Sequence, residues 1–200
     1  MRKQKGTNRL DGKDLMNVGI FTAVYFVINL LVAFALGLIP VVSTLIPFVS
    51  SLILGTPMML YFTKIKKPGM IFITCVVYGT FLLLAGVGIY TLVFGTICAL
   101  IAELILRLGR YQSVNMAILA FAMISVGANA NVLQMLFASA EYIAERAATY
   151  GAEYTNMMMG YYENWWYLPV IFLSAFVGGL LGGLLGKAVL NKHFVKSGLV

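Results

Sequence analysis

The sequence predicts an all-α integral membrane protein with six transmembrane helices and with both the N and C termini in the cytoplasm. Its composition, its apolar runs and the placement of its basic residues support this prediction. Of the 200 residues, 61% are hydrophobic and 10% are charged, whereas soluble domains carry about 25% charged residues. The net charge is +7, and the charged residues lie between the apolar runs. We therefore expect membrane lipid, and no nucleic acid, as a partner.

Six apolar runs, each suited to crossing a bilayer, are expected to form a single domain over residues 1–200. The runs are 15–38, 41–62, 69–85, 89–108, 114–140 and 165–190. Asp14 is a candidate N-cap for the first run, and Pro40 ends that run because proline lacks the backbone N–H of a helix. This run exceeds the roughly 7–15 residues of a signal-peptide core, so we expect it to be retained.

Prolines and glycines indicate how the later runs are divided. In the second run, Pro47 and Pro57 should bend the helix. Residues 69–108 are too many for one helix across a bilayer and suit two, joined by a turn at Gly86-Val87-Gly88. Residues 141–164 are expected to be a longer loop on the side opposite the termini.

The basic residues test this topology, because positive side chains near helix ends favour the cytoplasm. If the N-terminus lies inside, Arg146 is the one basic residue of the 14 that lies outside. Four of the seven acidic residues also lie outside, namely Glu141, Glu145, Glu153 and Glu163. Hydropathy and charge therefore give the same arrangement.

The absence of several motifs predicts that the chain itself catalyses no reaction. The sequence has no P-loop, HExxH or GxSxG motif, and no acid near the middle of a run, where proton-coupled carriers need one. Glu103 is expected to pair with Arg107, four residues later, or to contact a cytoplasmic partner. Cys75 and Cys98 suit apolar packing. We expect no enzyme activity, no cofactor and no metal site.

A polar stripe on the fifth helix is one candidate substrate-binding surface. Helical spacing would align Gly127, Asn131, Gln134, Ala138 and Glu141. Amide side chains in a membrane need partners, so this stripe should face other helices, either to bind a solute or to hold the helices together. Tyr90, at the outer start of the fourth helix, could contribute to the same surface.

The segment 157–167 is rich in methionine and aromatic residues, including Trp165 and Trp166. Tryptophan and tyrosine gather at membrane interfaces, which is one interpretation of the segment. The other interpretation is a lid over a pocket that opens outward, since aromatic rings stack on flat ligands and methionine adapts its shape.

Small residues mark two further contact surfaces. On the last helix, two rows at four-residue spacing allow a close approach of helix backbones, from this chain or another: Gly178, Gly182 and Gly186 in one row, and Gly179 and Gly183 in the second. On the first helix, Gly19 and Ala23 form a single small pair near the cytoplasmic end.

These features resemble the substrate-binding S component of an energy-coupling factor (ECF) transporter, which has six short spans, about 200 residues and no ATP site. Three segments are similar to the Trep_Strep, or MptD-like, group of S components. They are Lys13-Asp14-Leu15 leading into residues 19–26, the basic turn 64–68, and Gly127-Ala128-Asn129-Ala130-Asn131.

The resemblance implies a subunit of an ABC importer in the bacterial plasma membrane that captures a small organic nutrient or vitamin-like solute from outside. It implies docking on an ECF transmembrane coupling subunit that carries two ABC-type ATPases. The family usually docks through an AxxxA pair on the first helix, which here is Gly19 and Ala23. The family's solute site overlaps Asn131, Gln134 and Glu141.

Two features narrow the solute. Nickel and cobalt S components use an N-terminal histidine that this chain lacks, so the resemblance favours an organic solute. The negative outer loop disfavours an anion. The alternatives are a small secondary carrier or channel, and a membrane enzyme or assembly protein.

Overall fold

The protein is described by a computed structural model that covers residues 10–64 and 67–196, with side chains as far as residue 191. Within these ranges the regular structure is entirely helical. The helices are α1 (Gly12–Leu36), α2 (Pro40–Ser43), α3 (Ile46–Lys64), α4 (Met70–Leu84), α5 (Tyr90–Leu108), α6 (Val114–Ala128), η1 (Ala130–Val132), α7 (Leu133–Leu136), α8 (Ala140–Tyr150), α9 (Ala152–Tyr162) and α10 (Tyr167–Lys196).

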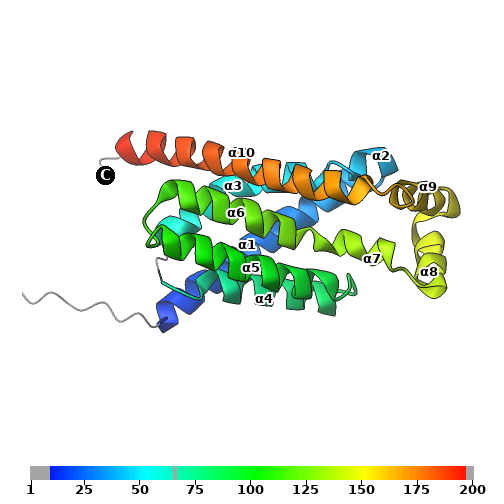
Figure 1. The fold of residues 1–200 in the computed structure, drawn as a ribbon, viewed down its shortest axis with the longest axis horizontal. Coiled ribbons are helices and arrows are strands. Elements are labelled where there is room, and N and C mark those ends of the chain that lie inside the picture. The colour runs from blue at the N-terminus through cyan, green and yellow to red at the C-terminus, as the bar shows by residue number, and fades with distance from the viewer. Residues whose placement is uncertain (1–9, 65–66, 197–200) are drawn as a thin grey trace, which may run out of the picture.

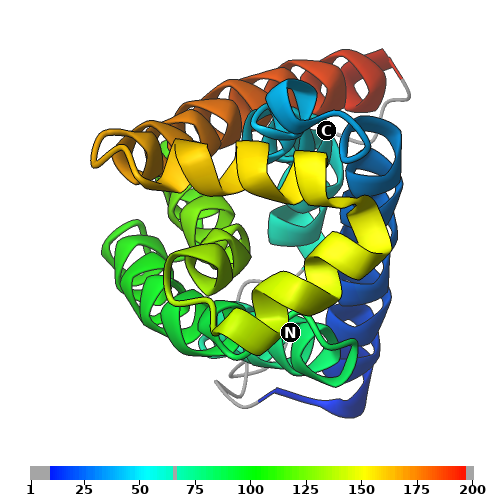
Figure 2. The ribbon, with the colours of Figure 1, turned by 90° about the vertical axis from the view of Figure 1, so that its right-hand side faces the viewer.

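The long helices form a bundle along one axis, and two short helices close one end of it. Helices α8 and α9 lie across the right-hand end of the bundle in Figure 1, and Figure 2 shows that end face on. We call this end, made by 140–162, the cap end. The opposite end, where α1 begins and α10 ends, is the terminal end. Residues 67–69, which precede α4, and the turn 109–113 also lie at the terminal end (Figure 1).

Five helices of the described chain are long and apolar enough to cross a membrane. They are α1, α3, α5, the combined segment Val114–Leu136, and α10 as far as Asn191. Helix α4 is apolar but has 15 residues, which give a length of about 22 Å against a hydrocarbon core of about 30 Å. The all-helical membrane fold is thus established, while a sixth span and the side of the termini stay predictions.

The second predicted run is divided into α2 and α3. The hydroxyls of Ser43 and Thr44 donate to the carbonyls of Pro40 at 2.7 Å and Val41 at 2.6 Å, at the end of α2. Pro47 lies in the first turn of α3, where a missing N–H costs little. Pro57 is accommodated inside α3.

The fifth predicted run is broken at Asn129. Its side-chain amide donates to the carbonyl of Ser125 at 2.8 Å, and α6 ends at the preceding residue. The expected loop 141–164 is also a misprediction, because α8 and α9 occupy most of it. Ser139 caps α8 by accepting from the Tyr142 N–H at 3.2 Å, and Gly151, with a φ of 92°, separates the two helices.

The glycine rows of α10 pack against two helices of the same chain. A Cβ atom built at Gly182 would lie 2.5 Å from the carbonyl oxygen of Ser51 in α3, and one at Gly186 would lie 2.6 Å from that of Gly55. In the second row, a Cβ at Gly179 would lie 2.7 Å from the Cα of Ala122 in α6, and one at Gly183 would meet Ile118. Because the first row faces α3 and the second faces α6, these three helices form the tightest part of the bundle.

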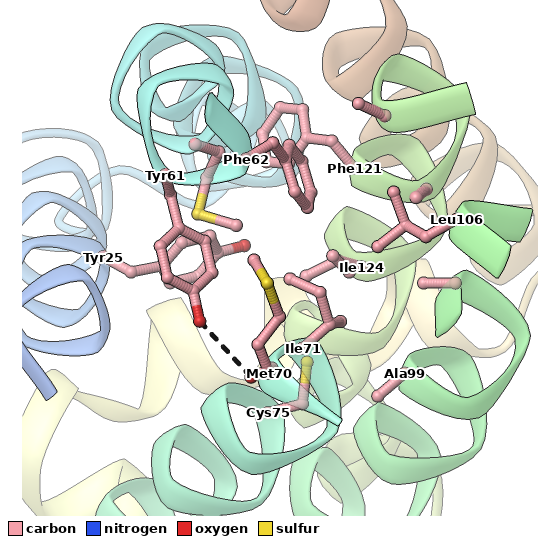
Figure 3. Packing of buried hydrophobic residues seen from close by; sticks show 14 of the residues in the cluster. Tyr25, Tyr61, Phe62, Met70, Ile71, Cys75, Ala99, Leu106, Phe121 and Ile124 are labelled. Carbon is pink, nitrogen blue, oxygen red and sulfur yellow. Dashed lines mark hydrogen bonds between the residues drawn. The ribbon is translucent and has the colours of Figure 1, made fainter. Parts of the chain in front are cut away.

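Polar contacts connect the helices near the terminal end. The Tyr61 hydroxyl lies 3.3 Å from the Met70 carbonyl oxygen, a bond drawn in Figure 3, and 2.7 Å from the Thr74 hydroxyl. Glu103 accepts from the backbone N–H of Ile71 at 3.1 Å and from the Tyr111 hydroxyl at 2.9 Å. Its carboxylate thus caps the start of α4, and among the described residues it forms no salt bridge with Arg107, contrary to our expectation.

The start of α1 is fixed by a second polar cluster. Asp11, and not Asp14, is the N-cap: Asp11 and Asp14 accept from each other's backbone N–H groups at 2.9 and 3.0 Å. Lys67, in the turn before α4, bonds to both carboxylates. The backbone bond to Asp14 and the Lys67 ammonium lower the pKa of Asp11. This cluster connects the first turn of α1 to the α3–α4 turn.

Candidate functional site

A small internal cavity lies among α1, α3, α4, α5 and α6, and we call it the central cavity. It measures about 10 Å³, close to the roughly 10–15 Å³ that one water molecule requires. Its walls are formed by Tyr25, Met58, Thr74, Cys75, Tyr78, Thr91, Gly95, Ile124 and Ala128. Figure 3 shows three of these residues, Tyr25, Cys75 and Ile124, converging from α1, α4 and α6.

One hydroxyl of this wall lacks a partner. Thr91 is 1% exposed, and its hydroxyl oxygen has no hydrogen-bond partner among the described residues. An unsatisfied buried polar group costs about 1–3 kcal/mol. Thr74, in contrast, donates to the Met70 carbonyl at 2.9 Å and also contacts the Tyr61 hydroxyl. Thr91 is therefore a fully buried wall residue whose hydroxyl has no partner among the described residues.

The remaining wall is uncharged and partly aromatic. Tyr25 and Tyr78 pack edge to face, with ring centroids 5.1 Å apart. No carboxylate, ammonium or guanidinium group lines the cavity. Across the part of the chain that the structure describes, no three His, Cys, Asp or Glu side chains group to hold a metal ion. The wall suits a neutral group with an apolar body and a hydrogen-bonding atom.

The cap end is covered by α8 and α9, which contact the bundle through a few side chains. The Tyr154 hydroxyl donates to the Gly37 carbonyl at 2.8 Å, and the Ser43 hydroxyl lies 3.6 Å from the Met158 sulfur. Both contacts connect α9 to the region between α1 and α3, including α2. The buried side chain of Thr155 bonds back to Gly151 at 3.0 Å.

Arg146, the basic residue of the cap, is engaged within α8. Its guanidinium lies 4.8 Å from the Tyr150 ring centre and 5.6 Å from the Tyr142 ring centre, and it donates to the Tyr142 hydroxyl at 3.0 Å. Such cation–π contacts hold a positive charge against aromatic faces. The four glutamates of this end, in contrast, are exposed, so the outer surface of the cap is negative.

The predicted stripe on the fifth helix does not form, because separate helices carry its members. Asn131 lies in η1, Gln134 in α7 and Glu141 in the first turn of α8. Asn131 and Glu141 are exposed. Gln134 is partly buried, and its side chain lies against Gly88 in the α4–α5 turn. These residues surround the cap end but do not line the central cavity.

The predicted aromatic residues also lie at the cap end. Tyr90 stacks on Phe137, with ring centroids 5.6 Å apart, and so joins the start of α5 to the end of α7. Trp165 is 87% exposed and Trp166 is 49% exposed. Trp166 meets Tyr167 edge to face at 6.4 Å. Exposed tryptophans at a bundle end fit an interfacial position.

The predicted docking pair lies on the outer surface of α1. Gly19 and Ala23 are both exposed, and a Cβ at Gly19 would meet no atom within 4 Å. Apolar side chains flank the pair, since Ile20 is 52% exposed and Val27 is 50% exposed. This surface of α1 is open to lipid or to another protein.

The wall of the central cavity was not predicted from the sequence. Its hydroxyl and aromatic residues come from three apolar runs, with Tyr25 in the first, Thr74 and Tyr78 in the third and Thr91 in the fourth, and together they form no motif. A signal that could have indicated this wall is the spacing of Thr91 and Gly95, which places a hydroxyl and a glycine one helical turn apart on α5.

Comparison with known families identifies one match. The model of a family described as "Hypothetical bacterial integral membrane protein (Trep_Strep)" matches residues 12–196. No curated protein and no solved structure compared with the chain matches it. The matched range runs from the first turn of α1 to the last residue of α10.

Proposed function

The chain belongs to the Trep_Strep family of hypothetical bacterial integral membrane proteins, and we propose that it is the substrate-binding S subunit of an ECF-type ABC importer. In this proposal α4 completes six spans, the terminal end faces the cytoplasm, and the protein lies in the bacterial plasma membrane. A small neutral organic solute, such as a vitamin-like nutrient, enters at the cap end. A transmembrane coupling subunit with two ABC-type ATPases supplies the energy, and the chain itself catalyses no reaction.

The observation that carries the proposal is the unpartnered Thr91 hydroxyl in the wall of the central cavity. A buried hydroxyl without a partner lowers the stability of the folded protein unless a ligand or water bonds to it. The uncharged wall favours a neutral solute. Thr91 also directly follows Tyr90, a predicted substrate-binding residue that lies at the cap end.

The small volume of the central cavity implies that the protein must change conformation to bind an organic solute. A space of about 10 Å³ holds one water molecule, and an organic solute is larger. The cap supports such movement, because α9 is connected to the α1–α2 region by single side-chain contacts from Tyr154 and Met158. We infer that α8 and α9 act as a lid that shifts when the solute enters.

Purification of the tagged protein from its native membranes tests this function. Mass spectrometry would identify the proteins and small molecules that are retained. A coupling subunit, two ATPases and a neutral organic molecule are expected. A self-associated chain that transports without an ATPase would favour a secondary carrier or channel, and turnover of lipid or peptide by the purified chain would favour an enzyme.

Replacing Thr91 by valine is expected to raise stability and to weaken solute retention. Valine has nearly the same shape but no hydroxyl, so the unpartnered polar atom is removed, and the free energy of unfolding should rise by about 1 kcal/mol. The amount of small molecule that co-purifies, measured by mass spectrometry, should fall at least tenfold.

Ser50 provides the matched control, because its buried hydroxyl also lacks a partner among the described residues but does not line the central cavity. Ser50→Ala should stabilise the protein without changing retention. Equal retention of the small molecule by the wild type and by Thr91→Val would show that Thr91 does not bind the solute.

Replacing Gly19 by leucine is expected to prevent assembly with the coupling subunit and to leave the fold intact. The position is exposed and a Cβ there meets no atom within 4 Å, so the added side chain should chiefly displace a partner. Co-purification of the ATPases should be lost, while thermal unfolding of the isolated chain stays unchanged. Ala35→Leu, exposed near the other end of α1, is the control and should keep the partners. Undiminished co-purification of the Gly19→Leu variant would exclude this surface as the docking site.

A further inference from the structure

A second pocket lies at the terminal end, and we call it the terminal pocket. It measures about 90 Å³ and lies where the last turns of α3 and α5 meet the α5–α6 turn. Its buried floor is apolar, and its rim is mostly polar and half-buried to exposed. The floor is formed by Met59, Phe62, Leu106 and Ala117, and the rim by Thr63, Tyr111, Gln112, Ser113 and Val114. Phe62 and Leu106 appear in Figure 3 on α3 and α5.

Three basic residues are neighbours in the sequence of residues that line the pocket: Lys64 follows Thr63, Arg107 follows Leu106, and Arg110 precedes Tyr111. The charge of Arg107 also acts on the Tyr111 hydroxyl, where it opposes the rise in pKa, so this guanidinium lies near the rim. All three are exposed, and the salt bridges within the described ranges do not include them. Glu103, four residues before Arg107 on α5, bonds to the Ile71 N–H and the Tyr111 hydroxyl. The three basic residues therefore form no ion pair with the described residues.

The turn that holds Arg110 has an unusual backbone. Arg110 and Tyr111 have φ values of 50° and 56°, in the left-handed region, which costs about 1–2 kcal/mol per non-glycine residue. The Tyr111 N–H bonds to the Leu106 carbonyl at 2.9 Å, and its hydroxyl bonds to Glu103. Burial, and then the bond to Glu103, raise the pKa of Tyr111 to about 12, so this donor stays protonated. Strain of this kind is concentrated at ligand sites and switches.

We propose that the terminal pocket binds an anionic phospholipid. The phosphate would lie near the basic residues and accept a hydrogen bond from the side-chain amide of Gln112, and the glycerol and first acyl carbons would cover the apolar floor. Basic pockets between transmembrane helices bind anionic headgroups, and the terminal pocket lies at the ends of helices that are long and apolar enough to cross a membrane. The apolar floor favours a phospholipid over free phosphate, because an inorganic ion would leave the floor uncovered.

The test uses the full chain, delipidated in a neutral detergent and titrated with phosphatidylglycerol or phosphatidylcholine. Native mass spectrometry counts bound lipids, and thermal unfolding reports stabilisation. Phosphatidylglycerol should bind and raise the unfolding temperature, whereas phosphatidylcholine should not. Equal effects of the two lipids would overturn the proposal. Equal stabilisation by glycerol 3-phosphate would identify a phosphate site that needs no lipid, and would overturn it too.

A double variant locates the site. Arg107→Gln with Arg110→Gln removes two exposed charges from the rim and should weaken phosphatidylglycerol binding at least tenfold. Lys13→Gln, which removes an exposed charge from α1 at the same end, should have little effect. If the double variant binds phosphatidylglycerol as wild type does, or if Lys13→Gln weakens binding equally, the terminal pocket is not the site. The solute retained from native membranes is measured separately, so this result is independent of the proposed transport function.

Discussion

Replacing Gly182 by leucine is expected to prevent the protein from reaching a monodisperse folded state. Even a Cβ atom at this position would lie 2.5 Å from the Ser51 carbonyl oxygen and 2.7 Å from that of Leu52. Both are backbone atoms of α3, so no side-chain rotation relieves the overlap, and α10 must separate from α3. Overpacking typically costs about 1–3 kcal/mol and at times more, a large part of the roughly 5–15 kcal/mol that stabilises a folded protein.

Size-exclusion chromatography and thermal unfolding in detergent measure this effect. Gly182→Ala should lower the unfolding temperature in the same direction by a smaller amount. The control is Gly19→Ala, at a helical glycine where a Cβ meets no atom within 4 Å. That change should be neutral or add up to about 1 kcal/mol, because alanine favours helices. A folded Gly182→Leu variant with wild-type stability would contradict the close α3–α10 packing.

Replacing Gly95 by alanine is expected to stabilise the fold while abolishing solute retention. Gly95 lines the central cavity, and a Cβ there would lie 3.5 Å from the Gly127 carbonyl oxygen, an ordinary van der Waals contact. The new methyl group therefore fits the resting structure and occupies the space that a solute needs. The gain from helix propensity is about 0.5–1 kcal/mol, and retained solute should fall at least tenfold.

Gly127 faces Gly95 across the α5–α6 contact and provides the comparison. A Cβ at Gly127 would lie 2.7 Å from the Cys98 Cβ and 2.9 Å from the Gly95 Cα, so Gly127→Ala should lower stability. The two substitutions are chemically identical, and opposite signs are expected from their surroundings alone. Thermal unfolding and mass spectrometry of retained molecules are the measurements. Full retention in Gly95→Ala would show that the solute binds elsewhere.

Hydropathy was sufficient to predict the all-helical membrane fold, because apolar length is what lipid demands of a spanning helix. Proline and glycine residues, which were also used in the prediction, lie where several helices begin or end. Pro40 begins α2, and Gly86 and Gly88, with φ values of 78° and 100°, lie between α4 and α5. The helices α8 and α9 were missed because they are short and rich in polar residues, and neither hydropathy nor a long apolar period marks them.

The candidate site was harder to predict than the fold. Polar residues such as Asn131 and Glu141 attract attention in an apolar sequence, yet the break at Asn129 places them on different helices at the cap end. The residues around the central cavity, among them Tyr25, Cys75 and Thr91, come from separate helices. Only the packing of α1 against α4 and of α5 against α6 brings them together, and this packing is a tertiary property that no single run encodes.

The bond between Lys67 and the first turn of α1 has a consequence for how α1 enters the membrane during synthesis. Lys67 is 56 residues from Asp11 and 53 residues from Asp14, so a ribosome releases both carboxylates well before it adds the lysine. The first helix must therefore enter the membrane without the partner that later fixes its end. Until the third helix has been made, its N-terminal turn is held by the local bonds between Asp11 and Asp14 alone, so α1 is not yet tied to the α3–α4 turn during the first stages of insertion.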